Sequence, residues 1–450
     1  MTKVKERLVS FFDGYLYPVC LALVIFACHT LSLEFLALTL IFISMAIALI
    51  VCDDMKALIS PTLYVIFCFS YKTFLSGALG SVGFLIVAII CLCLFGGGIT
   101  YNLTVNKKLH RLKDLPKSNL FWGICILSIA FLLNGFFAFN SYQGINIGFA
   151  ILLCFFLLFM YCVFYIGLNE RKDTVEYLMY VLYIASLILV AEMIVLISRD
   201  AIFINGQIIK ESLIVGWGSW NNIGGMLAIL LPIHFYYACV KKRGYIFYAT
   251  AILTYISIVF TLSRASLLFA TVISAICIVL ICIKSECLRT NRIITVCGAF
   301  FALIGIILLW NKLSTTLSSY FNQSLGDNGR FALYKHGIEN FLSHPIFGGG
   351  FGSCAEDFFG HGIEPNRYHN TVIELLATCG IVGFGAYVFH RYQTLKLFWR
   401  KRNHLSVVFL ALTILSLLLT SLLDNHFFNL YPTMYYAIIL CVIEKQYKEF

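Results

Sequence analysis

Long apolar stretches alternate with short polar segments along most of the chain. An α-helix needs about 20 apolar residues to cross a bilayer, and fourteen stretches reach this length or come close to it. They cover residues 15–29, 33–51, 59–75, 79–97, 119–138, 144–167, 176–198, 217–239, 245–262, 265–284, 293–311, 371–390, 404–422 and 428–444. The pattern predicts an all-α polytopic integral membrane protein with about 12–14 transmembrane helices.

The composition agrees with this class of protein. Hydrophobic residues make up 60% of the 450 and charged residues only 12%, whereas a soluble domain has no use for so much apolar surface. The seventeen cysteines lie mostly within apolar stretches without metal-ligand spacing, and we interpret them as apolar filler. The basic start of the chain resembles a signal peptide without a clear cleavage site, so we expect an uncleaved first helix.

The positions of the lysines and arginines test this arrangement, because these residues tend to stay on the cytoplasmic side. With the N-terminus inside, the alternation places all but eight of the 32 Lys and Arg residues in inner segments. The eight on the outer side are Lys72, Arg199, Lys210, Arg264, Lys312, Arg330, Lys335 and Arg367. Both termini are therefore predicted to be cytoplasmic.

One connection, residues 312–370, is far longer than the others and mostly polar. Loops of this length are usually functional or disordered. Residues 327–329 can start a helix, apolar side chains then follow at helical spacing, and Pro345 and a glycine run stop it. The apolar side chains are Phe331, Tyr334, Ile338 and Phe341. We predict an amphipathic helix on the outer membrane surface and a glycine-rich turn, residues 348–352, that returns the chain towards His369.

Three outer groups are the candidates for chemistry. Arg264 interrupts an apolar run, where a charge is costly unless it is paired or reaches water; it either marks a tight hairpin or binds an anion. Arg330 begins the loop helix, where amides and a guanidinium favour a diphosphate, or it is a solvated surface residue. His369 can act as a general base, because the unperturbed pKa of histidine lies near working pH, or it rests among headgroups. One base and two cations on one face predict a site for a phosphorylated substrate and a nucleophile that must lose a proton.

Other polar side chains are weaker candidates for substrate binding. They are Trp217, Trp220, Asn221, Asn222, Asn370, Lys335 and Glu374. The first four stand at the outer mouth of a span, where aromatic rings and amides suit sugars, although tryptophan is also common there as an interfacial residue. Glu374 either orients His369 or packs elsewhere.

Metal and nucleotide chemistry have no support in the sequence. The acidic pair at residues 53–54 falls on the inner side, which argues against a metal-binding pair at the outer site. The chain has no phosphate-binding loop, no dinucleotide fingerprint and no zinc-protease motif. We therefore expect no metal and no cofactor, and the energy for a reaction must come with the substrate.

Two glycines follow His369 in the same apolar run. Gly380 and Gly383 lie roughly three turns further along a helix with a rise of about 1.5 Å per residue. Glycine lets a neighbouring backbone come close, so we assign both to helix packing. The stretch predicts a membrane helix that packs closely against a neighbour and carries an ionisable group at its outer end.

This spacing resembles the O-antigen ligase and Wzy polymerase family of bacterial envelope glycosyltransferases. The family pattern, His then Asn, Ser or Gln, nine residues, Gly, two residues and Gly, is matched from His369 to Gly383. Its arginine between two spans is matched by Arg264, and its long-loop arginine, before a helix and a Pro-Gly turn, by Arg330. The resemblance covers about residues 216–390.

The resemblance implies a GT-C-like fold with three regions. Residues 1–215 would form N-terminal transmembrane helices, residues 216–390 the catalytic region with the outer loop 312–370, and residues 391–450 the C-terminal transmembrane helices. Members work on the outer face of the bacterial cytoplasmic membrane without metal or nucleotide. The implied partners are an undecaprenyl-diphosphate-linked glycan as donor, a sugar acceptor and membrane lipids, with a chain-length regulator as a candidate and no nucleic acid.

The implied mechanism is an inverting glycosyl transfer. Arg264 and Arg330 would hold the diphosphate as it leaves, while His369 deprotonates the acceptor hydroxyl. Fourteen spans exceed the dozen usual in ligases, which slightly favours a polymerase of O-antigen, capsule or exopolysaccharide repeats over a ligase that acts on lipid A-core. A lipid-linked oligosaccharide flippase is the alternative from another class, although its cations should line a central cavity rather than gather at one face.

Overall fold

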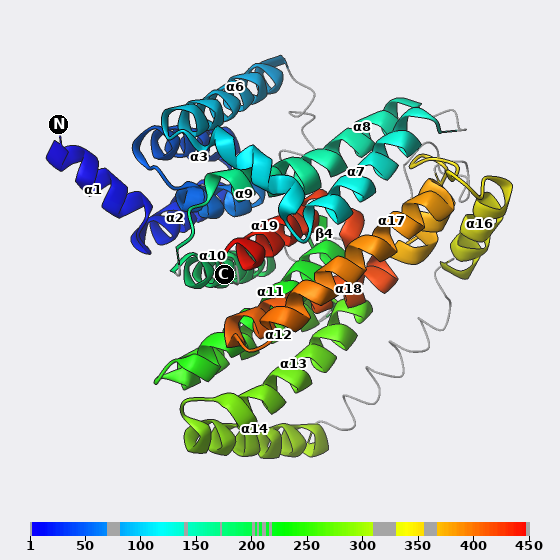
Figure 1. Cartoon of the computed structure of the whole chain (residues 1–450). Helices are drawn as coiled ribbons and strands as arrows, with labels where there is room; N and C mark the ends of the chain where they lie inside the picture. Colours follow the sequence, from blue (N-terminus) through cyan, green and yellow to red (C-terminus); the bar gives the residue numbers. More distant parts are fainter. Residues whose placement is uncertain are drawn as a thin grey trace.

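The computed structural model describes residues 2–69, 82–138, 143–171, 173–199, 203–204, 207–208, 213–215, 218–308, 330–354 and 367–446. Among these residues almost all regular structure is helical (Figure 1), which confirms the predicted all-α membrane class. Within the described residues, each of the fourteen predicted stretches coincides with a helix or with a series of short helices.

The first half holds, with η for 3₁₀ and π helices, α1 (Thr2–Phe12), α2 (Leu16–Thr30), α3 (Glu34–Val51), η1 (Met55–Leu58), α4 (Ile59–Tyr64), η2 (Val65–Cys68), α6 (Val82–Val105), η4 (Lys108–Lys117), α7 (Phe121–Phe136), α8 (Gln143–Cys154), η5 (Phe155–Phe159), α9 (Met160–Gly167) and α10 (Asp173–Arg199). Two short antiparallel pairs follow, β1 (Phe203–Ile204) with β2 (Gln207–Ile208) and β3 (Ile214–Val215) with β4 (Gly218–Ser219). The second half holds α11 (Trp220–Val240), α12 (Gly244–Phe260), α13 (Arg264–Lys284), α14 (Leu288–Leu308), α16 (Arg330–Ser343), α17 (Thr371–Lys401), α18 (Leu405–Asp424), η7 (His426–Phe428) and α19 (Leu430–Gln446).

Seven of the described helices are long and apolar enough to cross a membrane, or nine if each of two bent helix pairs counts as one span. The bent pairs are α1 with α2, at 69°, and the end of α6 with η4, at 94°. Three further apolar helices are shorter, and they comprise residues 55–68, α7 and α12. The predicted span 59–75 is thus a broken helix within its described part, and residues 70–75 lie outside the described residues.

The twelfth predicted span is longer than expected, because α17 continues past residue 390 to Lys401. We expected Arg391 in an inner loop, since a charge normally ends an apolar run. The guanidinium instead lies 4.5 Å from the ring centroids of Tyr387 and Phe427 and 4.8 Å from that of Tyr436. Aromatic faces attract a cation, so the helix continues with this arginine inside it.

Helix α11 forms the centre of the bundle. It is apolar on all sides, a pattern typical of a buried helix, and 94% of its spanning window is buried. It packs against α10, α12, α13 and α18. Two glycines allow close approach near its start: a Cβ at Gly224 would meet Thr261 and Ser266, and one at Gly225 would meet the ring of His426. The segments before α13 and α19 are thereby held against the first turns of α11.

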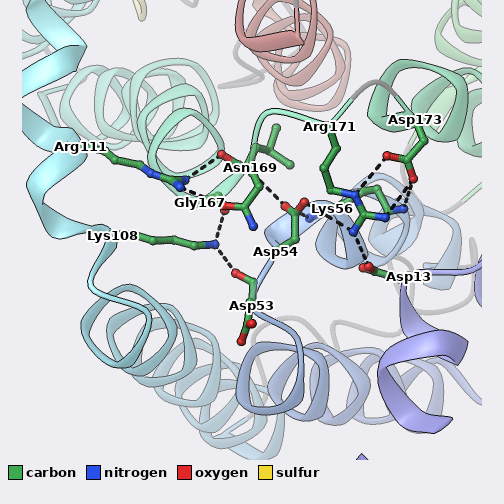
Figure 2. A network of polar contacts seen from close by, with 11 residues as sticks. Asp13, Asp53, Asp54, Lys56, Lys108, Arg111, Gly167, Asn169, Arg171 and Asp173 are labelled. Carbon is green, nitrogen blue, oxygen red and sulfur yellow. Dashed lines mark hydrogen bonds and ion pairs between the residues drawn. The ribbon is translucent and has the colours of Figure 1, made fainter. Parts of the chain in front are cut away.

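A polar network gathers at one end of the bundle (Figure 2). Lys56 Nζ is 2.8 Å from Asp173 Oδ2, and Arg171 Nη1 is 2.6 Å from Asp13 Oδ2. Lys108 Nζ donates to the carbonyl of Gly167 at 2.6 Å. Four of the predicted inner segments, those that hold Asp13, Lys56, Lys108 and Arg171, therefore meet at one end of the bundle, which is consistent with the charge alternation. We call this the Asp173 end.

The opposite end carries the start of α11. Tyr236, near the end of α11, donates to Glu176 in the first turn of α10, so these two helices are antiparallel and Trp220 lies away from the Asp173 end. Helices α13 and α17 begin, and α18 ends, at this same end. In Figure 1, α16 lies beside the first turns of α17 at the edge of the molecule.

Helix α17 is broken at Gly380, whose φ of 62° and ψ of −163° interrupt the helix. The turn after α16 fills the break with its own backbone. Gly349 and Gly350 donate to the carbonyls of Ala377 and Thr378 at 2.8 and 3.1 Å. In return, the amides of residues 381 and 382 donate to the carbonyls of residues 345 and 346 at 2.9 and 3.2 Å. The glycine-rich turn thus replaces the missing helical hydrogen bonds, and we call this exchange the backbone splice.

Candidate functional site

Three polar side chains converge on one carboxylate, Asp424, at the end of α18. Arg330 Nη2 at the start of α16 lies 3.0 Å from Asp424 Oδ1. Asn221 Nδ2 in the first turn of α11 lies 3.2 Å from the same oxygen. His369 Nδ1, in the segment before α17, lies 3.8 Å from it. These four residues, which we call the Asp424 cluster, come from parts of the chain far apart in sequence.

The backbone around His369 is fixed by local capping. His369 has a φ of 51°, a left-handed conformation that histidine adopts more readily than most residues. The side-chain oxygen of Asn370 then accepts from the amides of residues 372 and 373 at 2.9 and 3.2 Å, which is the N-cap arrangement. Thr371 Oγ1 donates to the carbonyl of Ser421 at 3.0 Å. The start of α17 is thereby tied to the end of α18, and His369 is held beside Asp424.

Helix α16 is held against the start of α17 by a close contact at Gly337 and by a hydrogen bond from Asn340. A Cβ at Gly337 would meet Ile373 and Tyr368, so the helix packs closely on the start of α17. Asn340 Nδ2 donates to the carbonyl of Ala377 at 3.1 Å. The predicted loop helix is thus present, and its first residue, Arg330, points to the Asp424 cluster.

The electrostatics of the cluster favour a neutral histidine. Burial, with the guanidinium groups of Arg330 and Arg367 nearby, lowers the pKa of His369 to about 4, although 37% of its side chain is exposed. Asp424 is 3% exposed and Arg330 is 31% exposed. Burial, with His369 and Arg367 nearby, likewise lowers the pKa of His426 to about 4. At neutral pH the site therefore offers an unprotonated imidazole beside a charged, partly accessible guanidinium.

A second layer of polar contacts supports the cluster. Arg367 Nη1 donates to the carbonyl of Phe428 at 2.9 Å and to Asn429 Oδ1 at 3.0 Å. Asn429 Nδ2 in turn donates to Asn222 Oδ1 at 2.9 Å. This chain of contacts joins the segment before α17, the segment before α19 and the first turn of α11.

The other residues predicted from the sequence lie at different distances from the Asp424 cluster in the chain's fold: some are at the same end of the bundle, and one is exposed on α16. Arg264 is exposed at the first position of α13, at the same end as the cluster, where the flanking Thr261 and Ser266 lie against Gly224. Trp220 begins α11 directly before Asn221, and Trp217 lies outside the described residues. Lys335 is 79% exposed on α16, with its Nζ 3.8 Å from Glu339 Oε1.

Two predicted binding residues have internal partners. Asn370 uses its oxygen as the helix cap, and its Nδ2 donates to the carbonyl of Leu422 at 3.0 Å. Glu374 is buried, and its Oε2 accepts from the amide of Tyr368 at 2.9 Å. Glu374 therefore positions the backbone beside His369 rather than its ring.

The glycines of the motif have separate surroundings. A Cβ at Gly380 would lie 2.4 Å from the carbonyl oxygen of Ile346, inside the backbone splice. A Cβ at Gly383 would meet Cys379 of the same helix. The glycine-rich turn therefore lies against residues 377–382 rather than at His369.

Sequence reasoning missed Asp424, Asn425, His426 and Asn429. A signal was present, because a carboxylate, an amide and a histidine stand together between the last two predicted spans, on the predicted outer side. Arg367 was counted as an outer cation but was not assigned to the site. Asp424, like Arg264, is a charged residue between two predicted spans.

The cluster suits an anion and a proton acceptor. Within the described ranges no group of three or more His, Cys, Asp or Glu side chains is placed to hold a metal ion. Arg330 can bind phosphate oxygens through its guanidinium, and His369 can take a proton. A multi-pass membrane protein with such a site at one end is suited to transfer between a membrane-anchored phosphorylated donor and an acceptor with a hydroxyl group.

Comparison with known proteins agrees with this class. Residues 249–388 match the family model described as O-antigen ligase. The match includes Arg264, Arg330 and the motif from His369 to Gly383, and it confirms the resemblance seen in the sequence. This region of the chain is therefore similar to the O-antigen ligase family, which supports a membrane glycosyltransferase. The search of curated proteins gave no match.

Proposed function

We propose that this protein transfers an undecaprenyl-diphosphate-linked glycan to a sugar hydroxyl on the outer face of the bacterial cytoplasmic membrane. The observation that carries the proposal is the Asp424 cluster, in which a neutral His369 and the guanidinium of Arg330 share one carboxylate within 3.8 Å. The predicted charge alternation supports the orientation, with both termini inside and residues 216–390 as the catalytic region. The chain would need no metal and no cofactor.

The proposed mechanism is a single displacement. Arg330 and Arg264 bind the donor diphosphate, and their positive charge stabilises it as it leaves. His369 accepts the proton of the acceptor hydroxyl. The acceptor oxygen bonds to the anomeric carbon as the bond from that carbon to the phosphate oxygen breaks, so the sugar inverts and undecaprenyl diphosphate departs.

Asp424 has two roles in this mechanism. With the donor absent, it neutralises Arg330, and the diphosphate then competes for that guanidinium. Its second role follows from His369 Nδ1, which faces the carboxylate, so the tautomer with the proton on Nδ1 leaves Nε2 free to act as the base. Trp220, Asn221 and Asn222, at the start of α11, are candidate sugar contacts, and Trp217 is a further candidate from the sequence.

Asp424→Asn should lower kcat without raising KM. His369 Nδ1 lies 3.8 Å from Asp424 Oδ1, beyond hydrogen-bond distance, so the carboxylate acts through its charge on the imidazolium that forms when His369 takes the proton. Loss of a unit charge at about 4 Å costs about 1–4 kcal/mol, so kcat should fall by about 10- to 100-fold. Removal of a negative charge beside the diphosphate should leave KM unchanged or lower. Steady-state kinetics on donor glycan would measure both. Asp114→Asn, at the other end of the bundle, is the matched control, and a higher KM with unchanged kcat would contradict these roles.

The acid limb of the pH profile should depend on Arg330. Because the pKa of His369 is lowered to about 4, kcat/KM of the native protein should fall only well below pH 6.5. Arg330→Gln removes a positive charge that opposes protonation, so the pKa should rise and the acid limb should move to higher pH. Arg330→Lys retains the charge and should leave the limb in place. An acid limb unchanged in Arg330→Gln would exclude His369 as the titrating base.

We favour a repeat-unit polymerase over a ligase, because fourteen apolar stretches exceed the dozen usual in ligases. The purified protein in nanodiscs would receive a short undecaprenyl-diphosphate glycan without metal or nucleotide, and the products would be separated by size. A ladder of lengths supports a polymerase, whereas one shift that appears only with lipid A-core supports a ligase. The absence of product with every envelope glycan would overturn the proposal in favour of transport.

A further inference from the structure

A groove lies between α17 and α18, on the half of these helices that is farther from the Asp424 cluster. It has a volume of about 970 Å³. Its walls are almost wholly apolar and include Tyr387, Leu395 and Trp399 of α17 and Val408, Ala411 and Leu415 of α18. Leu395 and Trp399 are 67% and 69% exposed, so the groove opens to the surroundings of the bundle. In a membrane this surface faces lipid chains.

Positive charge surrounds one end of the groove. Lys396 and Arg402 line it, and the segment 396–402 also holds Arg400 and Lys401. The guanidinium of Arg402 lies 4.4 Å from the ring centroid of Trp399, a distance at which the ring attracts the cation, and tryptophan is enriched at membrane interfaces. Arg400 donates to Asn119 and Lys401 is buried, so Lys396 and Arg402 are the cations at this end of the groove that can attract an anionic lipid headgroup.

The length of the groove fits a single leaflet. Its α18 wall runs from Val407 to Leu418, which at about 1.5 Å per residue corresponds to roughly 17 Å. Half of a hydrocarbon core about 30 Å thick is roughly 15 Å. An acyl chain of one leaflet therefore fits from the cationic end to the middle of the membrane.

We propose that this groove is a binding site for an anionic phospholipid, from the leaflet opposite to the Asp424 cluster. The phosphate and the net negative headgroup lie against Lys396 and Arg402, and one acyl chain fills the groove between α17 and α18. The charge complementarity distinguishes this occupant from a zwitterionic lipid with the same chains. The site does not depend on the proposed glycosyl transfer.

Native mass spectrometry of the full-length protein in detergent tests the site. Titration with phosphatidylglycerol and with phosphatidylcholine of identical chains should show tighter binding of phosphatidylglycerol. Replacement of the two lining cations near the end of α17, Lys396→Gln with Arg402→Gln, should weaken that binding by about 30-fold, the factor expected for two cations. Leu415→Trp should reduce it by filling the groove. Lys284→Gln with Arg289→Gln removes one Lys and one Arg at the same end of the bundle and should leave it unchanged.

Three results would overturn the proposal. Equal binding of both lipids would remove the charge argument. Equal loss in the Lys284 and Arg289 variant would show only a general attraction to basic surface. Displacement of phosphatidylglycerol by an undecaprenyl phosphate at a site sensitive to Leu415→Trp would assign the groove to the polyprenyl chain of the donor.

Discussion

His369→Ala should reduce glycan transfer by a factor of about 10²–10⁴, the usual contribution of a general base. The residue has a partly exposed ring, a pKa lowered to about 4 and a guanidinium neighbour bound to the same carboxylate. Without the imidazole, the only ionisable proton acceptor left in the Asp424 cluster is the carboxylate of Asp424, which already binds Arg330 and Asn221. The measurement is the initial rate of transfer by purified protein in nanodiscs.

Three measurements distinguish a loss of catalysis from a loss of folding in His369→Ala. His110→Ala, which removes an exposed histidine near the Asp173 end, should retain full activity. His369→Ala should keep the thermal unfolding midpoint within a few degrees, because 37% of its side chain is exposed. Added imidazole should restore part of the rate. Full activity of His369→Ala would refute its role as the base.

Gly380→Ala should destabilise the protein and abolish transfer. The backbone at φ 62° and ψ −163° is in a region essentially reserved for glycine, and another residue there costs about 1–3 kcal/mol. The added Cβ would also lie 2.4 Å from the carbonyl oxygen of Ile346 and 2.6 Å from the amide nitrogen of Gly348. The backbone splice must then open, which moves α16 and Arg330 away from the site.

The matched control is Gly385→Ala in the same helix, because a Cβ there meets no atom within 4 Å. It should be neutral or stabilising by up to about 1 kcal/mol. The readouts are the unfolding midpoint in detergent and the alkylation rate of Cys379, which is 2% exposed and precedes the break. Native stability and slow alkylation of Gly380→Ala would show that the splice is not required.

The apolar pattern was sufficient to predict the helices, because segments of spanning length have a strong and local signal. It did not predict the end of α17, since the three aromatic rings that hold Arg391 come from α17 itself, η7 and α19. It also predicted that Phe331 and Ile338 share an apolar face of the loop helix that lies on the membrane surface. Phe331 is 74% exposed, whereas Leu333 is 2% exposed and packs on the protein. Apolar residues line both faces of α16, and spacing alone could not decide which one packs.

The candidate site was predicted in part. His369 and Arg330 were identified by their chemistry and side, and the structure brings both to one oxygen. The carboxylate that joins them was not identified, because Asp424 lies 54 residues beyond Asn370 in the chain and acts only through its position. The backbone splice was not predicted either, since it pairs amides and carbonyls that leave no trace in side-chain identity beyond the glycines.

The backbone splice constrains how the protein is made. When α17 enters the membrane alone, the break at Gly380 leaves backbone amides and carbonyls without partners, and each costs several kcal/mol in hydrocarbon. Their partners belong to residues 345–350, which are synthesised earlier. The preceding loop must therefore already have been translocated when α17 inserts, and it must fold back onto this helix. Biogenesis should stall at this step when the loop is kept from translocating, even if every spanning segment is intact.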